Sequence, residues 1–350
     1  MAPDEHLLVQ PGDIAYNMMR MWQGAFGLAE IEGIVSPAYV VLKPKIRIDS
    51  RYASQLFKTK RLIHLFWAYS HGITDDRLRL YFADFARIPV TIPPLEQQKK
   101  IANVLATWDR AVSDAENLYL REAVLYDQMM RSLTTGIRRL EGYRGEWRTV
   151  SLAEIGSTFG GLTGKTIEHF GQGKPYIPYK TIFGNGRIDL EKLDYVNIES
   201  NENQNKCQFG DIFLTSSSET PDELGTASVL LDEVNELYLN SFSVGFRLKN
   251  FERLLPEFAQ FLLRGPKFRR SLIRLAQGYT RYNLSKHALL KVKLSLPNLD
   301  EQKAIADALS VTEKKLTLLR RNINSLKVER LAISQRLLLV KRNESAALSR

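Results

Sequence analysis

Two long stretches of the chain carry apolar residues at alternating steps of four and three. The first runs from Ile101 to Leu133 and the second from Ile305 to Leu337. A mean spacing of about 3.5 residues is the pattern of a coiled-coil seam, whereas a helix lying on a core follows about 3.6. Each stretch therefore predicts a helix of about 40 residues, or ~60 Å at 1.5 Å per residue, which is too long to bury its seam in a small domain. The predicted seam positions are Ile101, Leu105, Trp108, Val112, Tyr119, Tyr126, Met129, Leu133, Ile305, Leu309, Leu316, Leu319, Ile323, Leu326, Ile333 and Leu337.

The simplest arrangement is that the two helices pair with each other, antiparallel, with one globular domain at each end. The alternative is that each helix is a dimerisation arm between chains. Glu122, Thr312 and Arg330 are polar exceptions within the seam, and the second helix carries an excess of Lys and Arg. We interpret that excess as a solvated face whose cations pair with acidic residues across the seam, in preference to a DNA-binding face.

The chain also repeats itself. PPLEQQKKIANVL (93–105) matches PNLDEQKAIADAL (297–309), which places Gln98 on Gln302. The alternating segments just before, ARIPVTIP (86–93) and LKVKLSLP (290–297), predict a strand ended by Pro in both copies. SHGIT and AQGYT, and PGDIAY and FGDIFL, match in the same order further upstream. These matches predict an α+β fold in which two repeated domains are separated by the two long helices.

The two copies are unequal in length. Ahead of FGDIFL the second copy holds the segment 143–208, whereas ten residues precede PGDIAY in the first. We therefore predict a first domain that lacks its opening half, as a truncated product or one piece of a split gene would. The predicted domains are 1–94 (truncated), 95–140 (first helix and linker), 141–297 (complete), 298–343 (second helix) and 344–350 (tail).

Composition indicates which class of partner and which cell compartment suit the chain. The formal net charge of +10 over 350 residues suits a polyanion, of which nucleic acid is the commonest. Cys207 is the only cysteine, which excludes an intramolecular disulfide and a thiolate metal cluster and fits a reducing cytoplasm. We expect no metal site, no membrane span and no signal peptide, because the histidines are scattered and no apolar run is long enough.

Motifs for catalysis are weak or absent. FGGLTGKT (159–166) resembles a phosphate-binding loop, but Phe159 replaces the first glycine and the following residues are broken by Gly and Pro. It is either a loop held close to a ligand backbone, such as a DNA phosphate, or an ordinary tight turn. The sequence has no Gly-x-Ser-x-Gly elbow, no amino-methyltransferase tetrapeptide and no glycine-rich cofactor loop. We therefore expect no catalytic residue and no cofactor.

DNA recognition is the remaining chemistry. Arg and Asn read base edges bidentately, and Lys and Ser commonly hold phosphates. Such side chains near glycine turns of the second domain are the candidate DNA-binding residues: Lys165, Lys174, Tyr179, Lys180, Arg187, Ser216, Ser217, Ser218, Arg281, Tyr282 and Asn283.

The arrangement resembles the specificity subunit of type I restriction–modification systems over nearly the whole chain. The duplicated PPLEQQKKIANVL and PNLDEQKAIADAL are its most specific parts. EWRTVSLAEIGSTFGG (146–161) resembles the opening of a target-recognition domain, and GYTRYNLS (278–285) its closing loop. The resemblance implies a non-catalytic subunit that binds double-stranded DNA at a bipartite target. It also implies helices that act as a spacer and dock methyltransferase subunits, together with a restriction and translocase subunit.

The first copy departs from this family pattern. GITDDRLR (72–79) replaces the GYTRYNLS-type loop, is longer by two residues and contains two Asp, which would repel phosphate. The alternative function is a coiled-coil scaffold, or a truncated half-specificity protein, without DNA specificity of its own.

Overall fold

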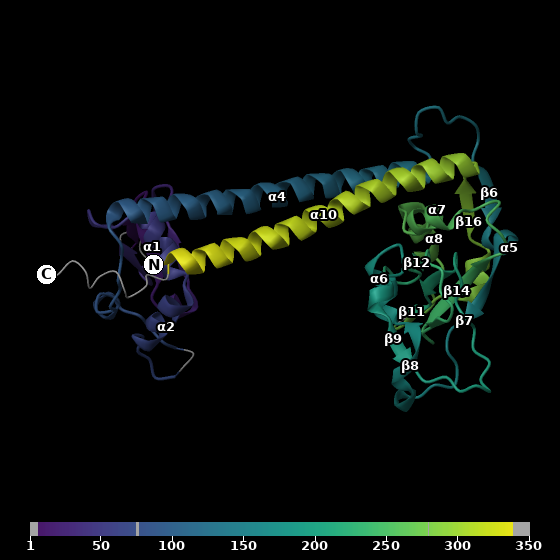
Figure 1. The fold of residues 1–350 in the computed structure, drawn as a ribbon, viewed down its shortest axis with the longest axis horizontal. Helices are drawn as coiled ribbons and strands as arrows, with labels where there is room; N and C mark the ends of the chain where they lie inside the picture. The colour runs from purple at the N-terminus through teal and green to yellow at the C-terminus, as the bar shows by residue number, and fades with distance from the viewer. Residues whose placement is uncertain (1–5, 75–76, 279, 339–350) are drawn as a thin grey trace. The chain divides into compact units, whose positions relative to one another are not determined.

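The structure is a computed structural model that describes residues 6–74, 77–278 and 280–338 (Figure 1). The chain divides into two compact units: unit 1 is Met1–Tyr119 with Leu318–Arg350, and unit 2 is Leu120–Thr317. The predicted tail 344–350 lies outside the described residues. Each unit contains part of both long helices, α4 (Leu95–Thr135) and α10 (Leu299–Leu338).

The two long helices pair antiparallel, as predicted. In unit 1, Arg330 Nε lies 2.8 Å from Asp109 Oδ1, and Lys327 Nζ lies 2.7 Å from Glu116 Oε1. In unit 2, Lys315 Nζ lies 2.7 Å from a carboxylate oxygen of Glu122. The residue numbers of the α10 partners fall from 330 to 315 as those of the α4 partners rise from 109 to 122, as in an antiparallel pair. The predicted seam positions are buried or half-buried. Basic residues of α10 thus form ion pairs with acidic residues of α4, and both helices belong to one chain.

Unit 1 is a small α+β unit built on the start of α4 and the end of α10. Its sheet has the order β3-β2-β5, and β1 pairs separately with β4. Its core contains Tyr16, Tyr52 and Phe66 together with Ile101 and Leu105 of α4. The elements are β1 (Leu7–Val9), β2 (Ile14–Asn17), η2 (Met21–Gln23), β3 (Phe26–Leu28), β4 (Gly33–Val35), β5 (Tyr39–Leu42), α1 (Ser50–Phe57), α2 (Lys60–Ala68) and α3 (Phe82–Phe85).

Unit 2 is larger and centres on a four-stranded antiparallel sheet with the order β12-β10-β14-β7. A three-stranded sheet, β13-β8-β9, and two pairs, β11-β15 and β16-β6, complete it. The elements are β6 (Arg148–Ser151), α5 (Leu152–Ile155), β7 (Gly156–Gly160), η3 (Ile167–His169), β8 (Phe170–Ile177), α6 (Tyr179–Gly184), η4 (Leu190–Lys192), β9 (Asp194–Val196), β10 (Ile212–Thr215), β11 (Ser217–Ser218), β12 (Ala227–Val229), β13 (Tyr238–Leu239), β14 (Ser243–Leu248), α7 (Pro256–Leu262), α8 (Pro266–Ile273), β15 (Tyr282–Asn283), α9 (Lys286–Leu290) and β16 (Lys293–Leu296).

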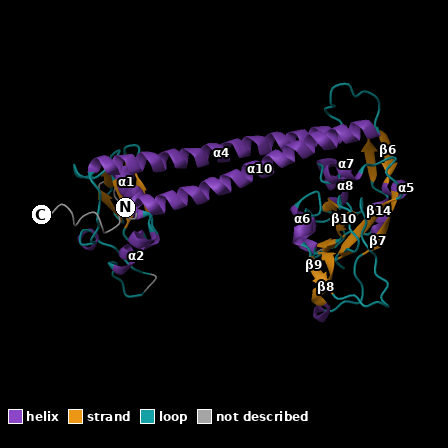
Figure 2. Ribbon diagram, viewed as in Figure 1, coloured by secondary structure: helices purple, strands orange, loops and turns teal. Residues whose placement is uncertain are grey.

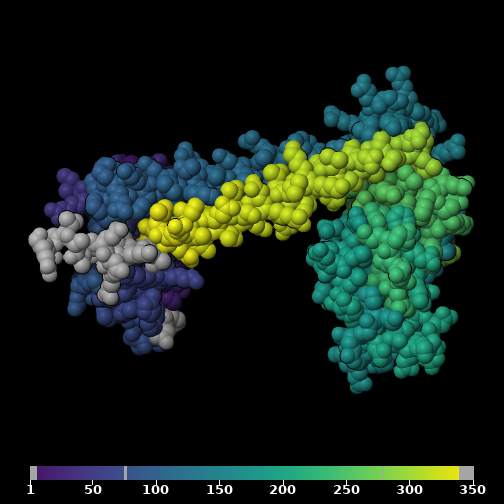
Figure 3. All heavy atoms as spheres, viewed as in Figure 1, coloured from purple at the N-terminus to yellow at the C-terminus, as the bar shows by residue number. Residues whose placement is uncertain are grey.

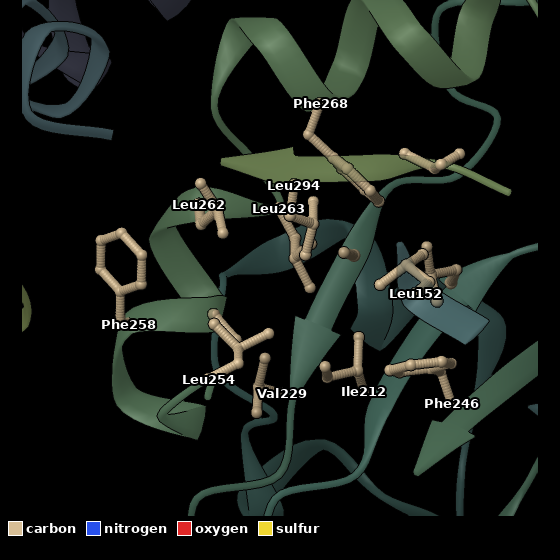
Figure 4. Close-up of a cluster of buried hydrophobic side chains, with 14 of the residues drawn as sticks. Leu152, Ile212, Val229, Phe246, Leu254, Phe258, Leu262, Leu263, Phe268 and Leu294 are labelled. Atoms are coloured by element: carbon tan, nitrogen blue, oxygen red, sulfur yellow. The ribbon is translucent and has the colours of Figure 1, made fainter. Parts of the chain in front are cut away.

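The main core of unit 2 joins the sheet to three helices. Ile212 and Phe246 of the sheet belong to the same buried cluster as Phe258 of α7 and Phe268 of α8 (Figure 4). Ile305 on the first turns of α10 closes this cluster, and Figure 2 shows α7 and α8 between α10 and the strands. The start of α10 is therefore fixed to its unit by apolar burial, which is the dominant favourable term in folding.

The repeated sequence motifs form the same structure twice. In PGDI, Gly12 N donates to Ala29 O and Ala29 N donates to Asp13 O, over 2.9 and 2.8 Å. In FGDI, Gly210 N donates to Leu230 O and Leu230 N donates to Asp211 O, over 2.8 and 2.9 Å. Each motif thereby leads its chain into the central strand of its sheet, β2 in unit 1 and β10 in unit 2.

A buried glutamine attaches each long helix to its unit. Gln98 Nε2 donates to Pro93 O (2.8 Å) and Arg47 O (3.1 Å), and its Oε1 accepts from Asp49 N (3.0 Å). Gln302 makes the same three bonds in unit 2, donating to Pro297 O (3.0 Å) and Arg253 O (2.8 Å) and accepting from Leu255 N (2.9 Å). The matched glutamines of the repeat therefore tie the turn before each long helix to the start of α1 or α7.

The two strands predicted before the long helices have different outcomes. Lys293–Leu296 forms β16, which pairs with β6. The segment 86–93 forms no strand, so that prediction is wrong for the first copy. In the described part of unit 1 no segment corresponds to β6, and Pro89 has no N–H to give a partner. A strand exists only where a second strand pairs with it. No described helix is long and apolar enough to cross a membrane.

Gln98→Ala tests the glutamine attachment. The change leaves two carbonyls and one N–H without their partner, at a cost of about 2–4 kcal/mol in the free energy of unfolding of unit 1. Hydrogen exchange of the buried amides of α1 measures this loss. Gln97→Ala, at the exposed neighbouring position, is the control and should change stability by less than about 0.5 kcal/mol. Equal effects of the two substitutions would contradict the assigned role.

Candidate nucleic-acid interface

A two-stranded pair brings together polar candidates from two distant segments of the sequence, 216–218 and 281–283. β11 pairs with β15 antiparallel, with Ser217 opposite Asn283 and Ser218 opposite Tyr282. Leu284 N donates to Ser216 O over 2.9 Å and extends the pairing by one residue. Six of the predicted residues, Ser216, Ser217, Ser218, Arg281, Tyr282 and Asn283, therefore form one cluster, which we call the β11–β15 site.

Tyr179 joins the β11–β15 site from the start of α6. Its hydroxyl donates to Ser217 O over 2.5 Å, while Arg281 Nε donates to Ser217 Oγ over 2.8 Å. Burial, reinforced by the nearby Glu223 carboxylate, raises the pKa of Tyr179, so the phenol stays protonated and remains a donor. The tyrosine hydroxyl thus restrains the backbone of Ser217, and the Ser217 hydroxyl in turn holds Arg281.

A cavity of about 310 Å³ lies beside these residues. Tyr179, Ser217, Ser218 and Arg281 line it, together with three residues that no sequence motif indicates: Glu219, Glu223 and Phe242. Glu223 accepts from Ser218 Oγ over 2.7 Å, and the Phe242 ring is exposed. Phe242 follows no recognisable motif, so only the fold reveals that its ring borders the cluster.

A glycine sets the shape of the loop that carries Arg281. Gly278 has φ of +130°, and a Cβ added there would lie 2.1 Å from the Arg281 carbonyl oxygen. Gln277 and Asn283 close the loop by two backbone hydrogen bonds of 3.1 and 2.8 Å. Tyr279 lies outside the described residues. The Gly of the predicted GYTRYNLS loop is therefore required for the close approach of backbone to backbone.

The remaining predicted residues face carboxylates. Lys165 is bound to Glu202 and its side chain is only 4% exposed, while Lys174 Nζ lies 2.6 Å from Glu236 Oε2. Arg187 forms an ion pair with Asp232, and Lys180 Nζ lies 4.0 Å from Asp194 Oδ2. A cation that already has a carboxylate partner has less charge to offer a phosphate.

The pKa values of the two glutamates reflect this pairing. Hydrogen bonds from Lys165, Gln204 and the Glu199 N–H lower the pKa of Glu202 to about 2, with Lys165 the largest cause. Hydrogen bonds from Lys174, Tyr238 and Lys206 lower the pKa of Glu236 to about 2, with Lys174 the largest cause. Both carboxylates are therefore ionised at neutral pH and hold their lysines within the fold.

The segment FGGLTGKT continues from the end of β7 and lies against the protein's own backbone, where Leu162 N donates to Leu239 O over 2.8 Å. A Cβ at Gly161 would lie 1.9 Å from the Asn240 carbonyl oxygen, so the close approach is to the protein's own backbone. The loop leads into η3, a single 3-10 turn of three residues. The glycine at position 161 therefore serves packing within unit 2. Among the described residues, no three His, Cys, Asp or Glu side chains gather as metal ligands would.

Unit 1 closes the corresponding loop in the same way. His71 pairs with Arg79, as Gln277 pairs with Asn283, and Leu80 N donates to Met18 O over 2.8 Å, as Leu284 N does to Ser216 O. The residues beside this loop in unit 1 are Met18 and Met19 instead of serines. Asp75 and Asp76, expected to repel phosphate, lie outside the described residues. Unit 1 thus repeats the backbone hydrogen bonds of the loop but not the polar side chains beside it.

Comparison with known proteins agrees with this architecture. The family profile described as "Type I restriction modification DNA specificity domain" matches residues 11–123 and 144–328. The type I restriction enzyme MjaVIII specificity subunit of Methanocaldococcus jannaschii is 25% identical over 338 residues, which cover 91% of this chain and 76% of that protein. The EcoKI specificity subunit of Escherichia coli is 24% identical over 246 residues, 67% of this chain and 52% of its own length.

Solved structures of two such subunits share the fold. The HsdS subunit from Thermoanaerobacter tengcongensis aligns with a TM-score of 0.55 at 18% identity, covering 96% of this chain and 83% of that one. The S subunit of the type I restriction–modification system from M. genitalium aligns with a TM-score of 0.57 at 17% identity, covering 97% and 85%.

Gly278→Ala tests the loop geometry directly. The added methyl group would displace the Arg281 carbonyl, so we expect the Asn283 amide, which donates to Gln277 O, to exchange at least about tenfold faster. Gly164→Ala is the control, because Gly164 also has a positive φ (+69°) but open space around its Cβ position. Unchanged exchange at Asn283 in the Gly278 variant would show that the loop tolerates a side chain there.

Proposed function

Because this chain belongs to the family of type I restriction–modification DNA specificity domains, we propose that it recognises DNA through the β11–β15 site of unit 2. The observation that carries the proposal is the pairing of β11 with β15. It gathers Ser217, Arg281 and Asn283 on one polar loop surface beside an open cavity. Polar side chains on loops held by a rigid sheet are typical of recognition surfaces.

Arg281 is positioned to read a base. Its Nε is held by Ser217 Oγ, and neither Nη atom has an acceptor among the described residues. A guanidinium held through Nε presents its other donors as a fork, which matches O6 and N7 of guanine in the major groove. The side chain of Asn283, exposed on β15 two residues further along, supplies the amide that pairs with adenine. We assign base reading to these two residues and stacking to the Phe242 ring.

Phosphate contacts need cations that are free of carboxylate partners. Lys165, Lys174 and Arg187 are held by carboxylates, so the proposed interface does not include them. Arg270 and Arg274 are exposed at the end of α8, which leads directly into the Arg281 loop, and we assign the phosphate contacts to them. The net charge of +10 supports binding that weakens as salt rises.

The chain is proposed to act without chemistry of its own. The two relatives are named as specificity subunits of restriction enzymes, which places recognition in this kind of chain. We assign methyl transfer to methyltransferase subunits and cleavage to a restriction and translocase subunit that assemble with it. The two repeated domains fit a target in two halves, of which unit 2 reads one.

Arg281→Ala tests the proposed reading. Loss of a bidentate contact costs about 1–3 kcal/mol, so affinity for the cognate duplex should fall roughly 5- to 150-fold, while binding to unrelated duplex at low salt stays nearly unchanged. The target is first obtained by mapping methylated sites in cells that express the chain with its methyltransferase subunit. Fluorescence anisotropy with both duplexes then measures the effect. Arg253→Ala, which removes another exposed arginine of unit 2, is the control. Equal losses in both variants would remove Arg281 from the site.

The paired helices offer a surface for the protein partners. Outside the seam, α4 exposes Leu120, Val124 and Leu125, and α10 exposes Val311. Figure 3 shows one face of α10 open to solvent. Leu and Val side chains left exposed on a helix that already has a buried seam are typical of a second contact surface. We assign methyltransferase docking to these apolar positions.

Leu125→Asp tests this docking surface. Leu125 is 57% exposed, so the charge should leave the helix pair intact but place a carboxylate in a desolvated interface. Co-purification with the methyltransferase subunit should fall at least about tenfold, with DNA binding by the free chain unchanged. Gln128→Asp, at an exposed polar position one turn later, is the control. Full co-purification of the Leu125 variant would place docking elsewhere.

A further inference from the structure

Opposite charges line the cavity of the β11–β15 site without pairing with each other. Arg281, Glu219 and Glu223 all contribute to its wall. Among the described residues, Arg281 forms no ion pair with either glutamate, whereas Lys165 and Glu202 of the same unit are bound to each other. Charges of opposite sign that are kept apart remain available to a ligand that offers both an acceptor and a donor.

Two neighbouring serines hold the two charges. Arg281 Nε donates to Ser217 Oγ over 2.8 Å, and Ser218 Oγ donates to Glu223 Oε2 over 2.7 Å. The other carboxylate oxygen, Glu223 Oε1, has no hydrogen-bond partner among the described residues. The cavity therefore presents a held guanidinium fork, which only donates, together with a held carboxylate, which only accepts.

The backbone of Glu223 is restrained as well as its side chain. Its carbonyl oxygen accepts from Thr215 Oγ1 and from Thr226 Oγ1, both over 2.8 Å. Arg269 of α8 donates to the next carbonyl, Leu224 O, over 2.7 Å. A carboxylate on a restrained turn loses little conformational freedom when a ligand binds, and this favours specific contacts.

Unit 1 forms the matching turn without a carboxylate. In unit 2, Thr215 N donates to Thr226 O over 3.1 Å and closes a turn of sequence SSSETPDELG, which has three acidic residues. In unit 1, Asn17 N donates to Ala25 O over 3.0 Å and closes a turn of sequence MMRMWQG, which has none. The turn itself therefore does not require Glu223, which favours a role in binding over a role in folding.

We propose that the β11–β15 site reads one G·C base pair, with Arg281 on the guanine and Glu223 on the cytosine. In the major groove guanine presents O6 and N7 as acceptors, and cytosine presents its N4 amino group as a donor. The Arg281 fork matches the two acceptors, and the Glu223 carboxylate accepts from the amino group. An A·T pair in the same place would set the adenine amino group against the guanidinium and thymine O4 against the carboxylate. This inference rests on the proposed recognition of DNA by the β11–β15 site.

Base-pair substitution in the mapped target tests the inference with the full chain. The position at which Arg281→Ala loses discrimination identifies the base pair that Arg281 contacts, and we expect G·C to be preferred there. Glu223→Ala should reduce the preference for G·C over A·T at that position at least about tenfold, and leave the preferences at other positions unchanged. Fluorescence anisotropy measures these affinities, and hydrogen exchange of the Asn283 amide checks that the Arg281 loop remains closed.

Methylation of the cytosine gives an independent measurement. In N4-methylcytosine the remaining N4 hydrogen pairs with guanine, so a methyl group replaces the donor in the major groove. We expect a duplex with this base at the Arg281 position to bind the unaltered chain at least about tenfold more weakly. The Glu223→Ala variant should bind the methylated and unmethylated duplexes equally, because two changes at one contact are not additive.

Glu219→Ala is the matched control, because it removes the same charge from the same cavity. It should change the affinity for all duplexes alike. The inference is overturned by a uniform effect of Glu223→Ala on all base pairs, by an equal position-specific loss in Glu219→Ala, or by full sensitivity of the Glu223 variant to methylation. Any of these results together with a specific loss in Arg281→Ala overturns this inference alone. Specific binding that survives Arg281→Ala overturns the proposed function of the site as well.

Discussion

Each globular unit depends on one buried amide side chain where its long helix begins. A helix of about 40 residues projects far beyond a small unit, so its direction is fixed only by what holds its first turns. Gln98 and Gln302 provide this restraint because one amide both donates and accepts. The amide donates to the proline carbonyl of the preceding turn and to the carbonyl of the residue two positions before the N-cap of α1 or α7. The N-cap N–H of the same short helix donates to its oxygen. The glutamine therefore couples three segments that apolar burial alone would leave free to slide.

The repeat made most of this architecture predictable. The seam follows from spacing, and the antiparallel pairing follows from two helices of equal length in one chain. Glu116 and Glu122 opposite lysines of α10 show that the acid and base pattern also identified the partner face. The strand at 86–93 could not be excluded in this way, because strand formation depends on a pairing partner elsewhere in the chain. Alternation alone cannot report whether that partner exists.

The candidate site was predictable in its loops but not in its charges. Ser217, Arg281 and Asn283 follow glycine turns and meet because β11 pairs with β15. Lys165 and Lys174 also follow glycine turns, yet their carboxylate partners lie 37 and 62 residues further along the sequence. Ion pairing over such a separation depends on tertiary structure, and it decides which cations remain available to a ligand. Composition therefore overstates the basic surface of unit 2.

The two units show how far one scaffold can diverge without losing its fold. Unit 1 keeps the Gly-Asp turn, the glutamine attachment and the closed loop, all of which are made by backbone atoms or by one buried amide. It differs where side chains face outward: Met19 stands where unit 2 has a serine, and Val41 where unit 2 has Gly245. Val41 is the informative change, because β5 is an edge strand, whereas the matching β14 pairs with β7, whose Phe159 ring leaves no room for a Cβ at Gly245. A strand with the sequence of β7 would therefore not fit beside β5, and the side chain at this one position separates the two sheets.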